Sequence, residues 1–209
     1  DGVTRDASVH GCLLLRPLPA HLRDVEDAIC NRLLPEKDVD GMTDVSAAGV
    51  YLGRSAGFAP CTAEAVTVLL DHYGIDCTGK RAVVIGRSPV VGRPAAMLLL
   101  ERNATVTVCH TRTQALSDVT READIIVSAA GAAGCLTAAH VRPGQTIIDV
   151  SANWDAAKNT IVGDADFDAA ASIVDAITPV PGGVGAVTSA VLMRHVVQAA
   201  ERTLEGGKL

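Results

Sequence analysis

From Lys80 onward, short apolar runs alternate with segments whose apolar residues have helical spacing. The apolar runs are RAVVIG, ATVTVCH, DIIVSAAG and QTIIDVSAN, and a helical segment, QALSDVTREA, follows the second of them. Runs that are this short and rich in Val and Ile are typical of strands buried on both faces of a sheet. Because strands that alternate with helices form parallel sheets, the sequence predicts a Rossmann-like, doubly wound α/β domain over residues 61–178.

Residues 1–60 and 179–209 are expected to form a second, smaller α/β domain. Residues 9–19 (VHGCLLLRPLP) form a strand-like apolar run that two prolines end. Apolar residues at helical spacing predict a helix over residues 21–34, and the Pro, Asp and Gly of residues 35–44 predict a loop.

Two threonines are candidate helix N-caps. Thr62 would begin a helix that extends to about His72, with Glu64 in its first turn. Thr188 would begin the long amphipathic helix at the end of the chain, after a loop rich in Pro and Gly. In that loop, residues 177–179 are a candidate position for a cis X-Pro bond.

Composition and charge exclude several classes of protein. The net charge of −6 and the lack of a basic run argue against nucleic-acid binding. No apolar run approaches the about 20 residues that span a bilayer, so we expect no membrane partner. Six scattered cysteines without C-x-x-C spacing predict reduced thiols in a cytoplasmic protein and no metal site.

The turn after the first buried strand, Gly86-Arg87-Ser88, is a candidate nucleotide-binding turn. It does not fit the G-x-G-x-x-G pattern. It does not fit the P-loop either, because no Lys-Ser/Thr pair follows the second glycine, Gly92. At the end of the first strand, however, backbone N–H groups and the dipole of the next helix favour an anion. Without a ligand, Arg87 would be a solvated turn residue.

The second strand ends in Cys109-His110-Thr111-Arg112, without the Asp or Glu with which NAD enzymes bind the ribose 2′-hydroxyl. Arg87 and Arg112 can instead bind a 2′-phosphate through their guanidinium groups. This difference favours NADP over NAD as the cofactor.

Several motifs resemble those of the bifunctional methylenetetrahydrofolate dehydrogenase/methenyltetrahydrofolate cyclohydrolase family. KDVDG, PCTAEAV, GKRAVVIGRSPVVGRPAAMLL, ATVTVCHTRT, ADIIVSAAG, VRPGQTIIDV and TPVPGGVGAVT occur in the family's order over nearly the whole chain. The resemblance implies NADP-dependent oxidation of 5,10-methylenetetrahydrofolate to the methenyl form, followed by hydrolysis to 10-formyltetrahydrofolate. It also implies a homodimer, formed through the sheet domain.

The resemblance assigns roles to individual residues. On the cofactor side it implies Gly86, Arg87 and Ser88 at the 2′-phosphate, Thr111 beside them, and Ala152 along the nicotinamide half. On the folate side it implies Asp40 as the pterin anchor, with Pro181, Gly182, Gly185 and Leu15 also at the substrate.

Asp40 also makes chemical sense as the anchor of a reduced pterin. A pterin presents a guanidine-like edge of N–H donors, and a carboxylate accepts two of them in parallel. Asp38 in the same KDVDG motif is expected to stabilise the loop instead. Without the resemblance, Asp40-Gly41 would be interpreted as an Asp-Gly turn and nothing more.

The chain departs from the family pattern at two places. The family's cyclohydrolase lysine belongs to a Tyr-x-x-x-Lys segment that this chain does not contain, and the chain begins at Asp1 without Met. We therefore expect the smaller domain to be incomplete at its N-terminus. In addition, Leu15 replaces a family glutamine, and leucine has neither donor nor acceptor for a lysine.

These departures leave alternatives to a bifunctional enzyme. The chain could be a dehydrogenase without cyclohydrolase activity, since hydride transfer depends mainly on the orientation of two bound ligands. It could also be a non-catalytic module that binds a nucleotide or a folate. Another Rossmann dehydrogenase would share the fold but would not explain KDVDG together with PGGVG.

Overall fold

The computed structural model describes residues 2–206, and residues 1 and 207–209 of the expected smaller domain lie outside that range. The chain divides into two compact units, which we describe separately. Unit 1 comprises residues 1–61 and 189–209, and unit 2 comprises residues 62–188.

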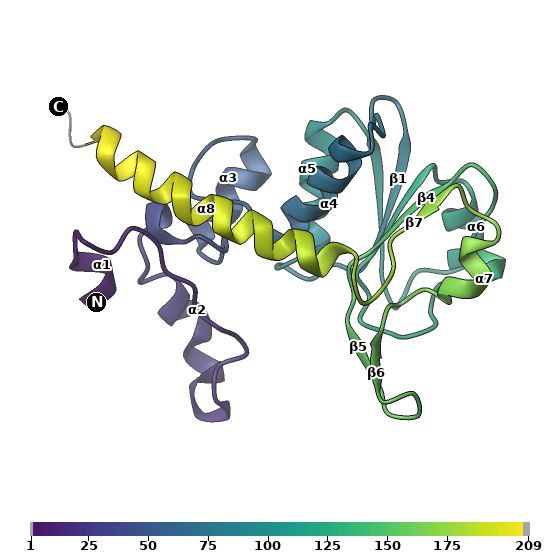
Figure 1. Ribbon diagram of the computed structural model, residues 1–209, viewed down its shortest axis with the longest axis horizontal. Coiled ribbons are helices and arrows are strands. Elements are labelled where there is room, and N and C mark those ends of the chain that lie inside the picture. Colours follow the sequence, from purple (N-terminus) through teal and green to yellow (C-terminus); the bar gives the residue numbers. More distant parts are fainter. Residues whose placement is uncertain (1, 207–209) are drawn as a thin grey trace. The chain divides into compact units, whose positions relative to one another are not determined.

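Unit 2 contains a parallel sheet of five strands (Figure 1). Their order in the sheet is β2-β1-β3-β4-β7. The strands are β1 (Arg81–Ile85), β2 (Thr105–Cys109), β3 (Ile125–Ser128), β4 (Thr146–Asp149) and β7 (Ala176–Ile177). Nearly every residue of the central strands β1, β3 and β4 is buried, as their runs of Val and Ile predict. The Rossmann-like, doubly wound α/β fold that the sequence predicts is therefore confirmed.

Helices cover both faces of this sheet. Figure 1 shows α4 and α5 on one face and α6 and α7 on the other. Their bounds are α4 (Cys61–His72), α5 (Gly92–Glu101), α6 (Leu116–Arg121) and α7 (Phe167–Ala171), and a short turn, η3, spans Ala138–His140. The core between the sheet and α6 and α7 is aliphatic, with Ile126, Leu136 and Ile147 completely buried.

The strand order reverses at β1, which has β2 on one side and β3 on the other. At such a switch point the connections leave in opposite directions, so a crevice opens outside the carboxyl ends of the two strands that separate there. Here those ends are Ile85 in β1 and Ser128 in β3, which are paired in register.

An antiparallel hairpin of β5 (Asn153–Asp155) and β6 (Thr160–Val162) follows β4, and the sequence analysis did not predict it. Its strands are only three residues long, and Trp154 is mostly exposed. Strands this short bury too little apolar surface to produce a recognisable alternation of polar and apolar residues.

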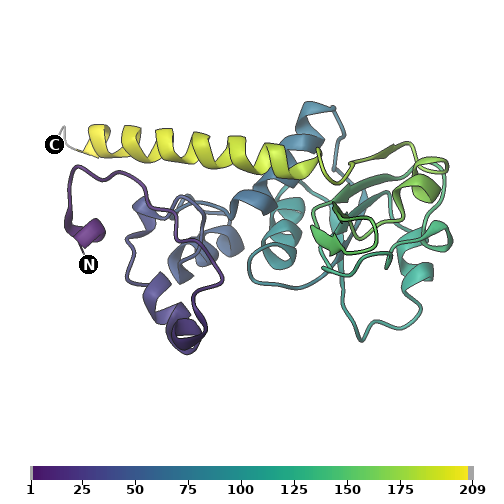
Figure 2. The same cartoon turned by 60° about the horizontal axis from the view of Figure 1, so that its bottom comes forward.

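Unit 1 consists mainly of helices. Its elements are α1 (Gly2–Arg5), η1 (Ala20–Val25), α2 (Glu26–Cys30), η2 (Pro35–Lys37), α3 (Asp44–Leu52) and most of α8 (Val184–Gly206). The segment from Val39 to Phe58 lies beside α8 (Figures 1 and 2), where the backbone oxygen of Val39 is 2.9 Å from Nδ1 of the buried His195. The ring of Phe58 stacks on the same histidine.

The expected strand over residues 9–19 is wrong for the described structure. The segment pairs only through an isolated bridge between Cys12 and Asp38, where the Cys12 N–H donates to the Lys37 carbonyl at 2.7 Å. A strand needs a neighbour along its length, and the described residues of unit 1 offer one at a single position. The helix expected over residues 21–34 is shorter, because it consists of η1 and α2 only.

Both expected N-caps are also wrong. Helix α4 begins at Cys61, so Thr62 lies inside its first turn, where Glu64 was correctly expected. Helix α8 begins at Val184, and the Thr188 hydroxyl donates to the Val184 carbonyl from within the helix. Threonine is tolerated inside a helix when its hydroxyl bonds to a carbonyl of the preceding turn, which the capping rule does not distinguish.

Unit 2 extends ten residues past the sequence boundary at Thr178 and therefore includes the loop before α8. Side-chain and backbone bonds between Thr178 and Asp149 hold the start of this loop at the end of β4. The loop contains a cis bond at Val180-Pro181, and not at residues 177–179, where it was expected.

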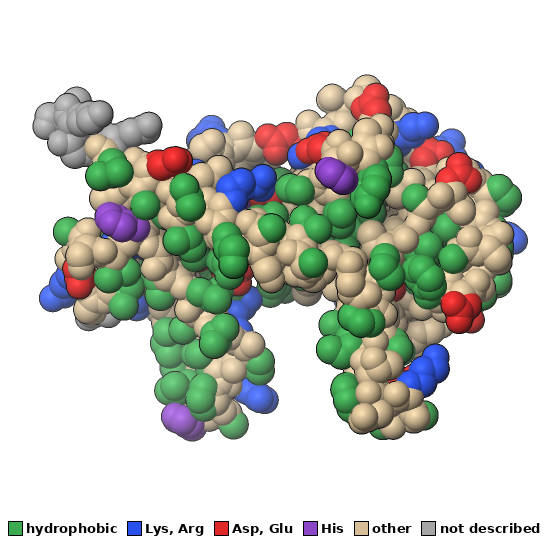
Figure 3. Space-filling view, in the orientation of Figure 1, with side chains coloured by type: hydrophobic (Ala, Val, Ile, Leu, Met, Phe, Trp, Pro, Cys, Tyr) green, Lys and Arg blue, Asp and Glu red, His purple; other side chains and the backbone are tan. Residues whose placement is uncertain are grey.

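On the face shown in Figure 3, Lys and Arg are interspersed with Asp and Glu. Among the described helices, none is both long and apolar enough to cross a bilayer.

Candidate functional site

The turn at Gly86 follows β1 directly and packs against the segment that follows β3. Gly86 has a φ of +118°, and a Cβ atom at this position would overlap the carbonyl oxygen of Ala129. Its N–H donates to the Cys109 carbonyl at 2.9 Å, which joins the turn to the end of β2. Only glycine fits this conformation at this distance from another backbone.

The N-terminus of α5 is held close to the same turn. A Cβ atom on Gly92, the first residue of α5, would overlap the Gly86 carbonyl oxygen. The Ser88 hydroxyl accepts hydrogen bonds from the N–H groups of Val91 at 3.1 Å and Gly92 at 3.4 Å. The two glycines therefore leave room for a close approach between the turn and a helix N-terminus, as a phosphate-binding turn requires.

Two arginines at this edge of the sheet have guanidinium groups without a partner among the described residues. Arg87, after β1, and Arg112, in the turn after β2, are both exposed. Neither guanidinium forms a hydrogen bond or an ion pair with any residue that the structure describes. Thr111, beside Arg112, is exposed too. The residues that would meet a 2′-phosphate are therefore not used elsewhere in the described fold.

The remaining expected residues of unit 2 lie in two other segments. Ala152 is exposed between β4 and β5, while Pro181, Gly182 and Gly185 are exposed around the start of α8. A groove of about 940 Å³ along β4 and β7 includes Gly182, but the Gly86 turn does not line it. The sheet thus brings Gly86, Arg87, Ser88 and Thr111 to neighbouring strand ends, and places Ala152 after the more distant strand β4.

Sequence analysis missed two buried carboxylates at the same edge of the sheet. Asp149 is the last residue of β4, and Asp164 lies in the loop before α7. Both are almost completely buried. For Asp149, the signal available in the sequence was an aspartate that directly follows a buried apolar run, in IIDVS. Asp164 follows a glycine and a partly exposed strand, in IVGDA, and carries no such signal.

Burial raises the pKa of the Asp149 carboxyl to about 6, although N–H groups of Ala165 and Ser151 donate to it. The nearby Asp164 raises it further. A raised pKa in the folded state stabilises the fold at pH below the ordinary value of 3.8, and this stabilisation is lost as the pH rises through 6.

We therefore expect the stability of the wild-type chain, relative to Asp149→Asn, to fall by about 2 kcal/mol between about pH 4.5 and pH 7.5. Denaturant unfolding of both chains at both pH values measures this difference. The variant also loses a hydrogen-bond acceptor, but the free-energy cost of this loss does not depend on pH and therefore cancels when the two pH values are compared. Asp175→Asn is the control, because this exposed carboxylate also accepts a backbone N–H, from Gly144. A pH-independent difference for Asp149→Asn would contradict the prediction.

In unit 1, the two aspartates of the KDVDG motif differ sharply. The Asp38 side chain is 1% exposed and accepts hydrogen bonds from the N–H groups of Met42 and Thr43 and from the Ser46 hydroxyl, at 2.7–2.9 Å. It therefore stabilises this loop and the start of α3, as expected. The Asp40 carboxylate is partly exposed and accepts no hydrogen bond from any described residue. Asp40 is thus free to bind a ligand.

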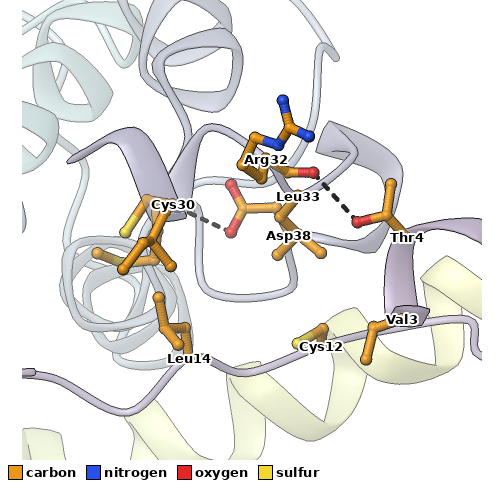
Figure 4. A pocket seen from close by; sticks show the side chains of 10 residues that line it. Val3, Thr4, Cys12, Leu14, Cys30, Arg32, Leu33 and Asp38 are labelled. Carbon is orange, nitrogen blue, oxygen red and sulfur yellow. Dashed lines mark hydrogen bonds between the residues drawn. The ribbon is translucent and has the colours of Figure 1, made fainter. Parts of the chain in front are cut away.

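A pocket of about 330 Å³ in unit 1 lies beside Asp38 (Figure 4). Its lining is mostly apolar and includes Leu14, Ile29 and Leu33, while Asp40 is not part of it. Because the Asp38 carboxylate already accepts three internal hydrogen bonds, it is a poorer acceptor for a pterin than the Asp40 carboxylate.

Leu15, which replaces the family glutamine, is 78% exposed. The next residue, Arg16, turns inward and forms an ion pair with Glu26 at 3.3 Å. The position that Leu15 occupies therefore faces solvent in unit 1, and a polar side chain would fit there without disturbing the packing.

Comparison with known proteins agrees with this geometry. The family model for the tetrahydrofolate dehydrogenase/cyclohydrolase NAD(P)-binding domain matches residues 60–204. The bifunctional protein FolD of Carboxydothermus hydrogenoformans is 53% identical over 194 residues, which is 92% of this chain and 67% of that protein. FolD of Clostridioides difficile is 46% identical over 94% of this chain and 68% of its own length.

Solved structures show the same similarity. The FolD methylenetetrahydrofolate dehydrogenase/cyclohydrolase of Campylobacter jejuni superposes with a TM-score of 0.92 at 44% identity, over 96% of this chain and 70% of that one. The Trypanosoma brucei enzyme, solved with NADP and an inhibitor, gives a TM-score of 0.89 at 36% identity, over 97% and 70% of the two chains. With this identity and coverage, the chain belongs to the tetrahydrofolate dehydrogenase/cyclohydrolase family.

Proposed function

We propose that this chain catalyses the NADP-dependent oxidation of 5,10-methylenetetrahydrofolate to 5,10-methenyltetrahydrofolate and the hydrolysis of that product to 10-formyltetrahydrofolate. The observation that supports this most strongly is the 53% identity to a bifunctional FolD protein over 92% of the chain. The Gly86 turn at the switch point of the sheet supports the cofactor half of the proposal independently.

On the cofactor side, each group has a chemical role that its position supports. The dipole of α5 attracts the pyrophosphate, while the N–H groups of Val91, Gly92 and Arg93 at the start of this helix donate to Ser88. The guanidinium of Arg87 binds the 2′-phosphate, with Arg112 and Thr111 near it. The nicotinamide half then extends toward the ends of β3 and β4, where Ala152 lies. NADP, when bound, accepts the hydride from the substrate.

On the folate side, Asp40 binds the guanidine-like edge of the pterin, and Pro181, Gly182 and Gly185 present backbone to flat ligands. The protein's contribution to hydride transfer is to orient the methylene carbon toward the cofactor. Loss of hydride leaves a methenyl cation. Water then adds to this cation, one C–N bond of the ring opens, and a proton is released.

Formation of NADPH from NADP and 5,10-methylenetetrahydrofolate, followed by its absorbance, tests the proposed function directly. We expect NADPH to form together with 10-formyltetrahydrofolate. A chain that binds both ligands without forming NADPH would instead be the non-catalytic binding module. Formation of NADPH with accumulation of the methenyl product would indicate a dehydrogenase alone.

The position of Leu15 leads to a prediction about the second step. We expect Leu15→Gln to change the rate of methenyl hydrolysis several-fold and that of hydride transfer by less than about twofold, because an amide adds a donor and an acceptor where leucine has neither. Leu13→Gln, at another exposed leucine two residues earlier, is the control. The two rates are measured separately, from methenyltetrahydrofolate consumption and from NADPH formation. Equal changes in both would remove Leu15 from the hydrolytic step.

The proposal includes a cytoplasmic homodimer. All six cysteines are free, which suits a reducing compartment. Strand β2 lies at the edge of the described sheet with Val108 partly exposed, and an uncovered edge strand can pair with a second copy. The mass of the particle that the chain forms in solution, equal to one chain or to two, tests the dimer.

A further inference from the structure

Asp164 is the most heavily hydrogen-bonded side chain at the carboxyl edge of the sheet. It is completely buried, with 0% exposure. No Lys, Arg or His of the described residues forms an ion pair with it, and its charge is balanced by hydrogen-bond donors alone. A buried carboxylate without a cation is costly unless its lone pairs are fully used, so its five donors are needed to keep it there.

The five donors come from both segments that border the proposed nicotinamide half of the cofactor site. After β3, the N–H groups of Ala130 and Ala132 donate to Asp164, each at 2.7 Å. After β4, the Ser151 hydroxyl donates at 2.7 Å and the Asn153 amide at 3.1 Å. The fifth donor is the hydroxyl of Ser128, the last residue of β3, at 3.0 Å.

Ser151 connects these two segments a second time. Its hydroxyl donates to Asp164 and also accepts the N–H of Gly131 at 3.2 Å. The segment after β3 is therefore tied to the segment after β4 both through the carboxylate and through this hydroxyl. Ala152, the residue expected along the nicotinamide, directly follows Ser151 in the sequence.

The hydrogen-bond network around Asp164 is connected to the Gly86 turn only through the segment after β3. Ala129, whose carbonyl oxygen lies against Gly86, precedes Ala130. The residues expected at the 2′-phosphate, Arg87 and Thr111, follow β1 and β2 and form no bond to Asp164. The carboxylate thus fixes the β3 and β4 side of the crevice and leaves the β1 and β2 side to other contacts.

We propose that Asp164 and Ser151 are positioning residues that hold the segments after β3 and β4 in the arrangement that receives the nicotinamide half of NADP. This inference rests on the proposed function. Asp164 touches no reacting atom in this proposal, because it acts through the backbone of residues 130–132 and 151–153. Loss of the network should weaken binding of the whole dinucleotide but spare a ligand that consists only of its adenosine phosphate half.

Two serine variants provide a matched test in the 209-residue chain. Ser151→Ala and Ser128→Ala each remove one hydroxyl that donates to the same oxygen of Asp164, but only the Ser151 hydroxyl also accepts the N–H of Gly131, whereas Ser128 also forms a hydrogen bond with the Cys135 thiol. Calorimetric titration of each variant with NADP and with adenosine 2′,5′-bisphosphate compares the two halves of the site. Denaturant unfolding of each variant measures its stability.

We expect Ser151→Ala to weaken NADP binding about tenfold and bisphosphate binding less than twofold, which corresponds to the loss of about one hydrogen bond. Ser128→Ala should reduce NADP affinity less than threefold, although its loss of stability should be similar to that of Ser151→Ala. Ser151→Thr, which keeps a hydroxyl, should bind NADP with the affinity of the unmodified chain. If the Asp164→Asn variant folds, it should lose more NADP affinity than Ser151→Ala. If it does not fold, the comparison of Ser151→Ala with Ser128→Ala tests the inference.

Equal losses for NADP and the bisphosphate in Ser151→Ala, or no loss for either, would overturn the inference. So would an effect of Ser128→Ala as large as that of Ser151→Ala, because a general loss of stability would then explain both. Failure of the proposed function looks different, since the unmodified chain would then form no NADPH from NADP and 5,10-methylenetetrahydrofolate, whatever the serine variants do to its affinity for NADP.

Discussion

Asp40→Asn is expected to weaken the binding of tetrahydrofolate derivatives about 100-fold and to leave NADP affinity within about twofold of the original. A carboxylate accepts two parallel N–H groups from the pterin, whereas an amide turns one of the two acceptors into a donor. One charge-assisted hydrogen bond is lost and two donors then face each other, at a cost of about 3 kcal/mol. Because Asp40 bonds to no described residue, its substitution should not disturb the fold.

Asp38→Asn is the matched control, with the same chemical change two residues away. Its carboxylate accepts from three donors within the loop and α3, so we expect a loss of stability in place of a selective loss of folate affinity. Titration with tetrahydrofolate and with NADP, together with unfolding, separates the two effects. If Asp40→Asn lost affinity for NADP as well, or kept its affinity for folate, Asp40 would not be the pterin anchor.

Arg87→Ala is expected to reduce affinity for NADP about 30- to 100-fold and affinity for NAD less than about threefold. The 2′-phosphate is the only group that distinguishes the two cofactors, and a guanidinium bound to a phosphate contributes about 2–3 kcal/mol. Arg87 is exposed and has no partner among the described residues, so its removal should cost little stability. Fluorescence titration with both cofactors measures the ratio.

Arg102→Ala tests whether the effect depends on position. Arg102 follows the last residue of α5, at the end of the helix opposite the Gly86 turn, and pairs with Asp71 at 2.9 Å. Its loss removes the same charge without approaching the strand ends at the switch point, so both affinities should stay unchanged. A similar drop for NADP and NAD in Arg87→Ala would mean that this arginine does not bind the 2′-phosphate.

Local patterns predicted unit 2 well because its strands are buried on both faces. RAVVI, IIVS and TIID have few polar positions, and such short Val/Ile runs separated by helices allow few other arrangements. The helix ends were predicted less well. Thr62 and Thr188 have suitable side chains for capping, yet both helices begin earlier, at Cys61 and Val184. Residue type indicates that a cap is possible, but the preceding backbone decides where a helix starts.

Unit 1 was predicted poorly for a different reason. Its apolar residues 9–19 have the composition of a strand, but the described structure offers a partner only at Cys12. A strand is stabilised by its neighbours, so composition alone cannot establish one. Within KDVDG, the sequence nevertheless predicted that Asp38 stabilises the loop, and the structure confirms this role.

The sequence by itself determined the α/β class, the order of the sheet domain's strands along the chain, the glycine turn at Gly86 and the family. Each of these features depends on residues, or on motifs, that are close together in the chain. Only the tertiary structure decided that β1 lies between β2 and β3, and that Asp164 gathers donors from segments between residues 128 and 153. Hydrogen bonds between residues so far apart in the sequence leave no periodic pattern in it, because they arise only when parallel strands end at the same edge of the sheet.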